Sequence, residues 1–175
     1  RNIVSNIPAN SAPFQILKAK PDGNCFYEAF LRGLTGGKVA PTAKQISSLR
    51  KKVQTYYTTK YANLANNYVV DTTLGGKAMS KKTFLEYVVK NGSWAGQAEI
   101  KAVSRTMKTN VIVMTPKFKI DTRLTQKNAA NKFTVYILYN GVNHFDTLIP
   151  KGAAPRFSLP TRASSGPRKP NIVDR

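Results

Sequence analysis

The sequence predicts an α/β (α+β) fold in which helices come first and a small central sheet is completed late. Through most of residues 14–108, apolar side chains recur every three or four positions, as in helices with one buried face. Two later runs, 111–114 and 133–139, are rich in β-branched and aromatic residues, which favour strands. The chain has 175 residues, 41% of them hydrophobic, which is enough to form one hydrophobic core without covalent cross-links such as disulfide bonds.

The chain is expected to divide into three parts. Residues 1–13 are mostly Asn, Ser, Pro and Ala and predict a flexible N-terminal arm. Residues 14–150 hold all the periodic segments and form the predicted domain. Residues 151–175 are rich in Gly, Pro, Ser and Arg and predict a disordered basic tail. The first residue is not methionine, so we expect a segment of a longer product.

The first elements surround a dense turn signal. Residues 14–19 alternate weakly and predict a short strand. The turn over 20–24 contains Pro, Asp, Gly and Asn, and it runs directly into a predicted helix over 25–34. Gly36 and Gly37 end this helix. Because the helix begins at residue 25, the only cysteine is its first residue.

Three further helices are predicted. A helix over 42–61 has Thr42 as its N-cap. The segment 62–79 is expected to be irregular. Helices over 80–91 and 96–108 follow, the first of them capped by Ser80.

The remaining strands come late in the chain. The runs 111–114 and 133–139 are predicted strands, and Asn140-Gly141 begins a tight connection to a last strand over 144–149. This hairpin carries the only histidine.

The charge of the chain is strongly positive, at +20 from 28 Lys+Arg against 8 Asp+Glu. Residues 14–150 alone carry +14. Such a balance is typical of proteins with an anionic partner, which can be nucleic acid, an acidic membrane or an acidic protein surface. Most lysines, however, occupy positions typical of a solvated helix surface, which favours the simpler interpretation that the charge marks a solvated surface.

Several classes of protein are excluded by composition. One cysteine excludes an intrachain disulfide, and one histidine excludes every two-histidine metal motif. We therefore expect no metal site, and the thiol chemistry considered below needs no cofactor. No apolar run approaches the 18 residues of a spanning helix, and the start lacks the pattern of a signal peptide.

The cysteine and histidine occur in settings that suit nucleophilic catalysis. Cys25 lies where a Gly-containing turn meets a helix, and free backbone N–H groups there favour a thiolate and an oxyanion. His144 and Asp146 are two residues apart on a predicted strand, so both face the same side and the carboxylate can orient the imidazole. The alternative is that Cys25 is a small buried hydrophobe and His144 a structural surface residue.

Three strings resemble the OTU (ovarian tumour) family of cysteine proteases. Residues 21–30, PDGNCFYEAF, look like the Asp-Gly-Asn-Cys-Phe nucleophile motif of that family. Residues 143–146, NHFD, resemble its histidine motif, and 94–113 resemble its middle block. The three blocks occur in the family's order, although Ala95 separates Trp94 from Gly96 where the family usually has Gly directly.

The resemblance implies a papain-like OTU fold and a thiol-dependent isopeptidase of the deubiquitinase type. Cys25 would be the nucleophile and His144 the general base and then the general acid. Asp146 would orient His144. Asp22 is a second candidate acid, or it shapes the loop that carries the oxyanion donors.

Further site residues follow from the same resemblance. The oxyanion donors would be backbone N–H groups at Gly23, Asn24 and Cys25. Trp94 and Phe145 are the candidate substrate-binding residues, although a core position for Trp94 is the simpler and favoured expectation.

The expected partners are ubiquitin or polyubiquitin conjugates, processed by a monomer. Few carboxylates are present to meet the arginines of a ubiquitin tail, so a ubiquitin-like modifier is an alternative substrate. The competing hypothesis is a catalytically decayed OTU-like module that binds nucleic acid or acidic membrane through its basic surface. A thiol that must stay reduced suits the cytoplasm, including a host cytosol entered by a viral or bacterial effector.

Overall fold

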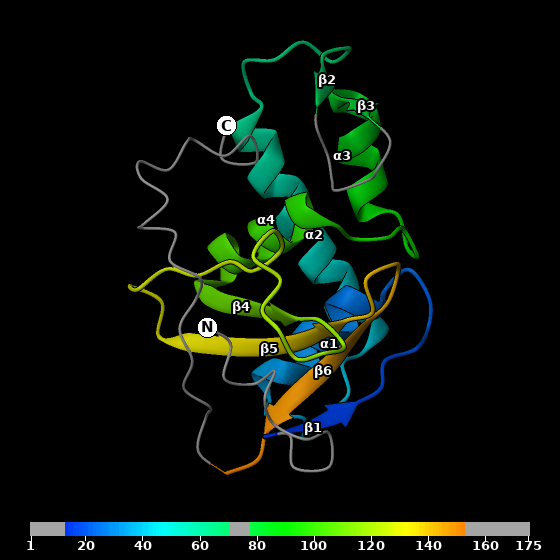
Figure 1. The fold of residues 1–175 in the computed structure, drawn as a ribbon. Coiled ribbons are helices and arrows are strands. Elements are labelled where there is room, and N and C mark those ends of the chain that lie inside the picture. The colour runs from blue at the N-terminus through cyan, green and yellow to red at the C-terminus, as the bar shows by residue number, and fades with distance from the viewer. Residues whose placement is uncertain (1–12, 71–77, 153–175) are drawn as a thin grey trace.

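A four-stranded mixed sheet and four helices make up the described part of the chain. The computed structural model describes residues 13–70 and 78–152. The elements are, in chain order, β1 (Phe14–Leu17), α1 (Cys25–Leu34), α2 (Ala43–Lys60), β2 (Val69–Val70), β3 (Met79–Ser80), α3 (Lys81–Val89), α4 (Gln97–Met107), β4 (Thr109–Met114), β5 (Phe133–Tyr139) and β6 (Phe145–Pro150) (Figure 1). The predicted α/β class, a small sheet with flanking helices, is confirmed.

The order of the sheet is β1-β6-β5-β4, with β4 and β5 parallel and the other pairs antiparallel. Because β6 lies between β5 and β1, the start of β6 is flanked by the end of β5 and by the segment that leaves β1. Tyr139 at the end of β5 pairs with Phe145, and Leu17 of β1 pairs with Thr147. Residues from two distant parts of the sequence, the segment after β1 and the β5–β6 connection, therefore meet at this end of the strands.

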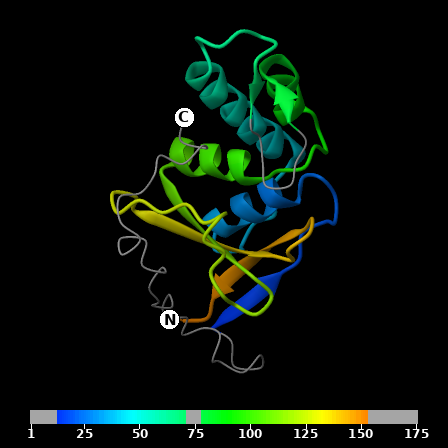
Figure 2. The ribbon, with the colours of Figure 1, turned by 45° about the horizontal axis from the view of Figure 1, so that its top comes forward.

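The helices lie on the sheet and beyond it. Helix α1 contacts β5 and β6, and its Ala29 carbonyl accepts a hydrogen bond from the Thr147 hydroxyl at 3.0 Å. Helix α2 contacts both α3 and α4. Figure 2 shows α2 and α3 at one end of the molecule and the sheet at the other, with α4 and α1 between them. The buried apolar side chains of α1 and α2 join those of the sheet in one core.

Local sequence signals explain where the helices begin. Thr42 and Gln45 form a capping box, in which the Thr42 hydroxyl accepts from the Gln45 N–H at 3.1 Å and the Gln45 side chain accepts from the Thr42 N–H. The Ser80 hydroxyl accepts from the Thr83 N–H at 3.2 Å. Both predicted caps are confirmed.

The segment 62–79 is less irregular than the sequence predicts. Its described part contains β2 and β3, which pair antiparallel through Val69 with Ser80 and Val70 with Met79. The prediction of an irregular segment was therefore wrong for these residues. Strands of two residues are too short to show the alternating pattern by which a strand is predicted. Helix α3 also ends two residues before the expected Asn91.

The predicted arm and most of the predicted tail lie outside the described residues, so both remain predictions. Within the described ranges, no helix combines the length and apolarity that crossing a bilayer requires.

Candidate active site

The only cysteine begins helix α1 and is almost completely enclosed. Cys25 is 1% exposed, and Asn24 before it is the N-cap residue of α1. The Cys25 thiol donates a long hydrogen bond of 3.9 Å to the Asn143 carbonyl and also accepts from the backbone N–H of Phe145. The sulfur therefore lies against the backbone on both sides of His144.

The surroundings of the thiol favour its neutral form. Burial raises the pKa of Cys25 above its usual value, and the charges of Asp22 and Asp146 act in the same direction. Backbone N–H groups of Phe145 and Phe26 lower that pKa but do not outweigh burial. A resting thiol in this site needs a base that accepts its proton as it attacks.

His144 and Asp146 form the close pair expected from their spacing. The His144 Nε2 atom lies 2.7 Å from Asp146 Oδ1. The carboxylate accepts the Nε2 proton, so Nδ1 carries the lone pair. That Nδ1 is buried and has no hydrogen-bond partner among the described residues. The imidazole thus has one orienting contact and one nitrogen available as a base.

Asp146 is itself held in place by the neighbouring strand. Its Oδ1 also accepts from the Ala19 N–H at 2.8 Å, and its Oδ2 lies 3.5 Å from the ammonium of Lys18, whose side chain is largely exposed. Ala19 follows β1, and Asp146 is in β6 beside it. The carboxylate that orients His144 is therefore fixed by the pairing of the first strand with the last.

A single asparagine organises the turn before His144. The Asn140 Oδ1 accepts hydrogen bonds from the N–H groups of Val142 and Asn143 at 2.8 Å each and of His144 at 3.0 Å. The Asn140 N–H donates in turn to the His144 carbonyl at 3.0 Å. Asn140 therefore fixes the backbone of the histidine from both sides, a function that its turn-forming tendency alone does not indicate.

The loop before Cys25 is held by Asp22. The Asp22 Oδ1 accepts from the Asn24 N–H at 2.9 Å, and the Asp22 carbonyl accepts from the Cys25 N–H at 3.2 Å. Two of the three candidate oxyanion donors thus contact Asp22 within the loop. Gly23 is required by a close approach, because a Cβ there would lie 1.5 Å from the Gly92 carbonyl oxygen.

Arg50 is a buried residue at the site that sequence reasoning missed. It is 1% exposed and lies in α2 between the buried residues Leu49 and Val53. Its guanidinium donates to Asn24 Oδ1 at 2.6 and 3.2 Å and to the Gly23 carbonyl at 3.3 Å. It also donates to the Ser93 hydroxyl at 2.8 Å and the Ser93 carbonyl at 2.7 Å. Arg50 therefore connects the nucleophile loop to the segment after α3.

A second buried charge lies near Arg50. Glu99 is 2% exposed, and its side chain accepts from the Gly96 N–H at 2.9 Å at the start of α4. Burial raises the pKa of Glu99 to about 7, against the opposing effects of backbone N–H groups and of the Arg50 charge. An aromatic ring is also close, since the Arg50 guanidinium lies 4.3 Å from the centroid of Tyr27.

The two candidate substrate-binding residues have different surroundings. Trp94 is 43% exposed, so the alternative that placed it in the core is wrong. Its backbone carbonyl accepts from the Tyr87 hydroxyl at 3.1 Å. Phe145 is 3% exposed and its ring stacks on Tyr139 at 4.6 Å. In this structure Phe145 supports the site from the core, whereas Trp94 faces solvent.

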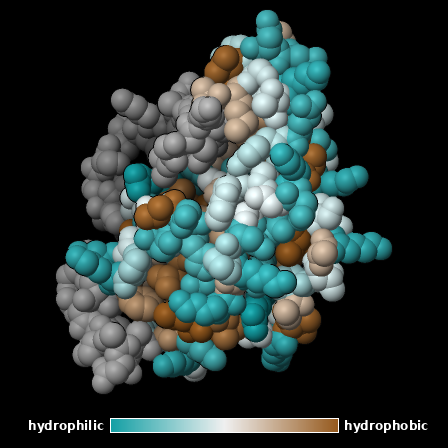
Figure 3. All heavy atoms as spheres, turned by 90° about the vertical axis from the view of Figure 1, so that its right-hand side faces the viewer, coloured by the Kyte–Doolittle hydropathy of each residue, from teal (hydrophilic) through white to brown (hydrophobic). Residues whose placement is uncertain are grey.

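Hydrophilic residues cover most of the face shown in Figure 3.

Known structures have a similar fold. The structure is similar to the Hazara virus OTU bound to ubiquitin, with 16% identity, a TM-score of 0.55 and coverage of 80% of this chain and 83% of the other. It is also similar to an OTU deubiquitinase from Wolbachia pipientis wMel bound to ubiquitin, with 17% identity, a TM-score of 0.55 and coverage of 81% and 99%. At these identities the likeness shows the fold.

The family is shown by sequence. A search of curated proteins found no match. The family model described as OTU-like cysteine protease matches residues 20–145, well over half of the chain. The chain therefore belongs to the OTU-like cysteine protease family.

Proposed function

We propose that this protein is a thiol-dependent isopeptidase that removes ubiquitin or a ubiquitin-like modifier from conjugates. The observation that carries the proposal is the position of the Cys25 sulfur against the backbone on both sides of His144, whose Nε2 contacts Asp146 and whose Nδ1 has no partner among the described residues. A cysteine nucleophile requires a base and a group that orients the base, and His144 and Asp146 are the candidates for these two groups beside the backbone that contacts the thiol.

The first half of the reaction forms a thioester. The Cys25 sulfur attacks the isopeptide carbonyl carbon while its proton passes to Nδ1 of His144. The resulting tetrahedral oxyanion is held by N–H groups of the loop at residues 23–25. The Cys25 N–H is the more easily shared donor, because its bond to the Asp22 carbonyl is long at 3.2 Å. Nδ1 then protonates the leaving lysine amine as the C–N bond breaks.

The second half regenerates the enzyme. A water molecule gives a proton to Nδ1 and attacks the thioester carbonyl. When the C–S bond breaks, the sulfur regains a proton from the imidazolium and the modifier leaves with a free carboxylate. Asp146 stabilises the imidazolium in both halves through its 2.7 Å contact with Nε2. The cycle uses neither a metal nor a cofactor.

Substrate has to displace the cover over Cys25. The sulfur contacts the Asn143 carbonyl, and Asn143 belongs to an exposed turn in which Val142 is 76% exposed. Access of a substrate to the thiol therefore requires this turn to move. We therefore expect slow alkylation of the resting enzyme by iodoacetamide and faster capture by a probe that includes the modifier.

Few acidic side chains are available to hold a basic modifier tail. Glu99 is buried, and Asp121 is 9% exposed and lies 3.7 Å from Arg123. Glu86 on α3 is exposed. Recognition of the modifier thus depends on backbone and apolar contacts more than on ion pairs, which leaves ubiquitin-like modifiers as substrates to test beside ubiquitin.

The alternative of a decayed enzyme has less support. A scaffold released from catalysis has no need to hold Asp146 with two hydrogen bonds and the His144 turn with three. A thiol nucleophile works in a reducing compartment, so we place the reaction in the cytoplasm. The expectations of a monomer and of a viral or bacterial effector remain predictions.

The decisive experiment uses ubiquitin with a C-terminal propargylamide as an electrophile. Wild-type protein should form a covalent adduct, detected by intact mass, and Cys25→Ala should form none. His144→Gln should form adduct at least a hundredfold more slowly, because the base is lost. Thermal unfolding of each variant checks that the fold is retained.

Substrate choice is tested with the same enzyme on every linkage of di-ubiquitin and on the matching probes of ubiquitin-like modifiers. Cleavage that disappears in Cys25→Ala supports the proposal. The proposal is wrong if the folded wild-type protein ignores all of these probes and substrates.

A further inference from the structure

A basic cleft lies away from Cys25, where α4, the segment before β5 and β4 meet. Its volume is about 680 Å³. The described residues that line it are Ser104, Arg105, Lys108, Gln126, Lys127, Asn128, Ala130 and Asn131. Three of these are cations, three are amides that can donate hydrogen bonds, and none is acidic. Such a lining suits an anion with several hydrogen-bond acceptors.

The wall of the cleft is held firmly in place. The Asn110 Oδ1, in β4, accepts from the Asn128 N–H at 2.8 Å and from the Asn131 side chain at 3.0 Å. Gln126 exchanges two backbone hydrogen bonds with Val111, at 2.8 and 2.9 Å. The segment that carries Lys127 is therefore preorganised by contacts with a central strand, which reduces the entropy lost when a ligand binds.

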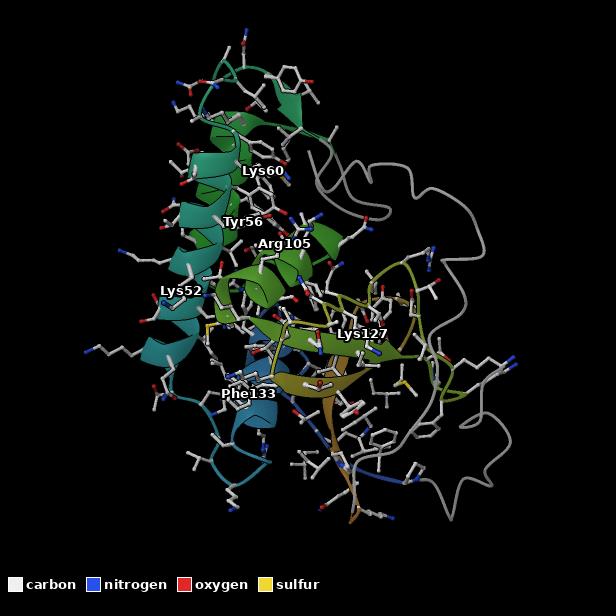
Figure 4. The ribbon with its side chains drawn as sticks, turned by 90° about the vertical axis from the view of Figure 1, so that its left-hand side faces the viewer. Lys52, Tyr56, Lys60, Arg105, Lys127 and Phe133 are labelled. Atoms are coloured by element: carbon white, nitrogen blue, oxygen red, sulfur yellow. The ribbon has the colours of Figure 1, made fainter. Side chains whose placement is uncertain are left out.

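The positive surface continues beyond the cleft along α2. Figure 4 shows Lys52, Tyr56 and Lys60 along this helix, with Arg105 beside Tyr56. The Arg105 guanidinium donates to the Tyr56 hydroxyl at 3.4 Å, so α2 and α4 are joined at this surface. Lys52 and Lys60 are about 12 Å apart along the helix axis. This exceeds the size of one phosphate group, so the surface fits a chain of phosphates.

The charges at this surface repel one another. Burial lowers the pKa of Lys60, and the nearby Arg105 charge lowers it further. Helix α2 has no acidic residue, and the sequence has none between Asp121 and Asp146. A polyanion would relieve this repulsion.

An exposed aromatic ring completes the surface. Phe133 begins β5, is 65% exposed, and pairs with Thr109, the residue after Lys108. Figure 4 shows Phe133 and Lys127 on the same face as Arg105. An exposed aromatic ring beside a basic groove is the combination by which proteins stack the bases of single-stranded nucleic acids.

This surface and the candidate active site lie at opposite ends of β5. Phe133 is at its first residue, and Tyr139, which pairs with Phe145, is at its last. Seven residues of strand span about 20 Å. A ligand in the basic cleft would leave the Cys25 region open.

We propose that the face formed by the basic cleft, the Lys52–Lys60 side of α2 and Phe133 binds single-stranded nucleic acid. Lys108 and Lys127 contact phosphates at the cleft, the amides of Asn128 and Asn131 donate to phosphate or base oxygens, and Phe133 stacks on a base. Binding here is independent of the proposed hydrolysis.

The test measures binding of a fluorescein-labelled 20-nucleotide uridine RNA to the full chain by anisotropy, from 50 to 300 mM salt. Lys108→Glu/Lys127→Glu should weaken binding at least tenfold and lower the slope of log Kd against log salt by roughly 1.4, at 0.7 per phosphate contact. The control Lys82→Glu/Lys117→Glu makes the same change in net charge at two exposed lysines on other elements and should lose less than threefold.

The aromatic contribution has its own control. Phe133→Ala should weaken RNA binding about tenfold, whereas Val69→Ala, at a similarly exposed apolar residue, should leave it unchanged. Unfolding midpoints confirm that each variant is folded, and ubiquitin-probe labelling should be the same for all four variants.

Three outcomes overturn the proposal. Equal losses in the two double variants would mean that net charge alone attracts RNA. Equal affinity for a duplex of the same length would contradict stacking on Phe133. Binding to phosphatidylserine vesicles without binding to RNA would assign the surface to membranes.

Discussion

The two ends of β5 use charge in opposite ways. At the end near Phe145, the charged side chains of Asp146 and Arg50 are buried, and each is held by several hydrogen bonds. At the end near Phe133, the cations Lys108 and Lys127 are exposed, and their cleft has no acidic residue among its described lining. At the buried end, the charged groups hold neighbouring residues in fixed positions. At the exposed end, the cations are available to attract a negatively charged partner.

This difference has a physical consequence that experiments can use. Buried charge pairs are weakly screened by salt, whereas exposed charges lose most of their effect beyond about 8 Å at physiological ionic strength. Hydrolysis at Cys25 should therefore vary little with salt, and nucleic-acid binding should fall steeply. Each prediction below changes the buried end only and should leave RNA affinity unchanged.

The largest effect is expected at Arg50. Arg50→Met removes the hydrogen bonds of the guanidinium to Asn24 and Ser93, and the Ser93 carbonyl, inside the protein, loses its 2.7 Å donor. We expect a loss of about 3–5 kcal/mol in the free energy of unfolding, measured by urea denaturation.

Arg50→Lys is the matched control for the position of the nucleophile loop. It keeps the charge but cannot donate to Asn24 and Ser93 at once. The rate of hydrolysis, kcat, should fall about tenfold while KM changes little. A wild-type kcat in Arg50→Lys would show that Arg50 does not position the loop.

A smaller effect on stability, but a clear one on hydrolysis, is expected at Asn140. Asn140→Ala removes the acceptor of three backbone N–H groups in the turn before His144. The imidazole then loses its fixed position, and kcat should fall ten- to a hundredfold. Asn140→Asp keeps an acceptor oxygen and should recover most of the activity. If both variants lose activity equally, the acceptor is not what matters.

The last effect is confined to a range of pH and concerns Glu99. Because burial raises its pKa from 4.5 to about 7, the folded state binds this proton more tightly than the unfolded state. The stabilisation is complete below about pH 4.5 and is lost as the pH rises through 7.

Glu99→Gln removes this titration and keeps an oxygen to accept from the Gly96 N–H. Relative to wild type, the free energy of unfolding of the variant should rise by roughly 3 kcal/mol between pH 4 and pH 8. Parallel pH profiles for the two proteins would show that Glu99 does not titrate in this range.

Local signals predicted most of the elements correctly because their causes are local. The Thr42 and Ser80 caps, the helix beginning at Cys25 and the strand over 133–139 depend on neighbouring residues, and the structure has them where predicted. The hairpin of β2 and β3 was missed because each strand has only two residues.

Arg50 shows why parts of the site escaped prediction. In the helical repeat of α2, Arg50 lies next to the buried residues Leu49 and Val53. An arginine at such a position is expected to extend to the surface, because arginine is rarely buried. Its partners, Asn24 and Ser93, are 26 and 43 residues away. Nothing local indicates that these acceptors converge on one guanidinium.

The sequence by itself determined the chemistry available to this protein: one thiol, one imidazole, a carboxylate two residues from it, and a large excess of cations. Only the tertiary structure decided how these groups are used. The packing of α1 on β5 and β6 brings Cys25 to the backbone on either side of His144. The pairing of β6 with β1 anchors Asp146 on Ala19, while the cations of α4 and of the segment before β5 lie at the far end. The reason is physical: residue type sets what a group can do, but distance and burial, which depend on contacts between remote segments, set whether it does so.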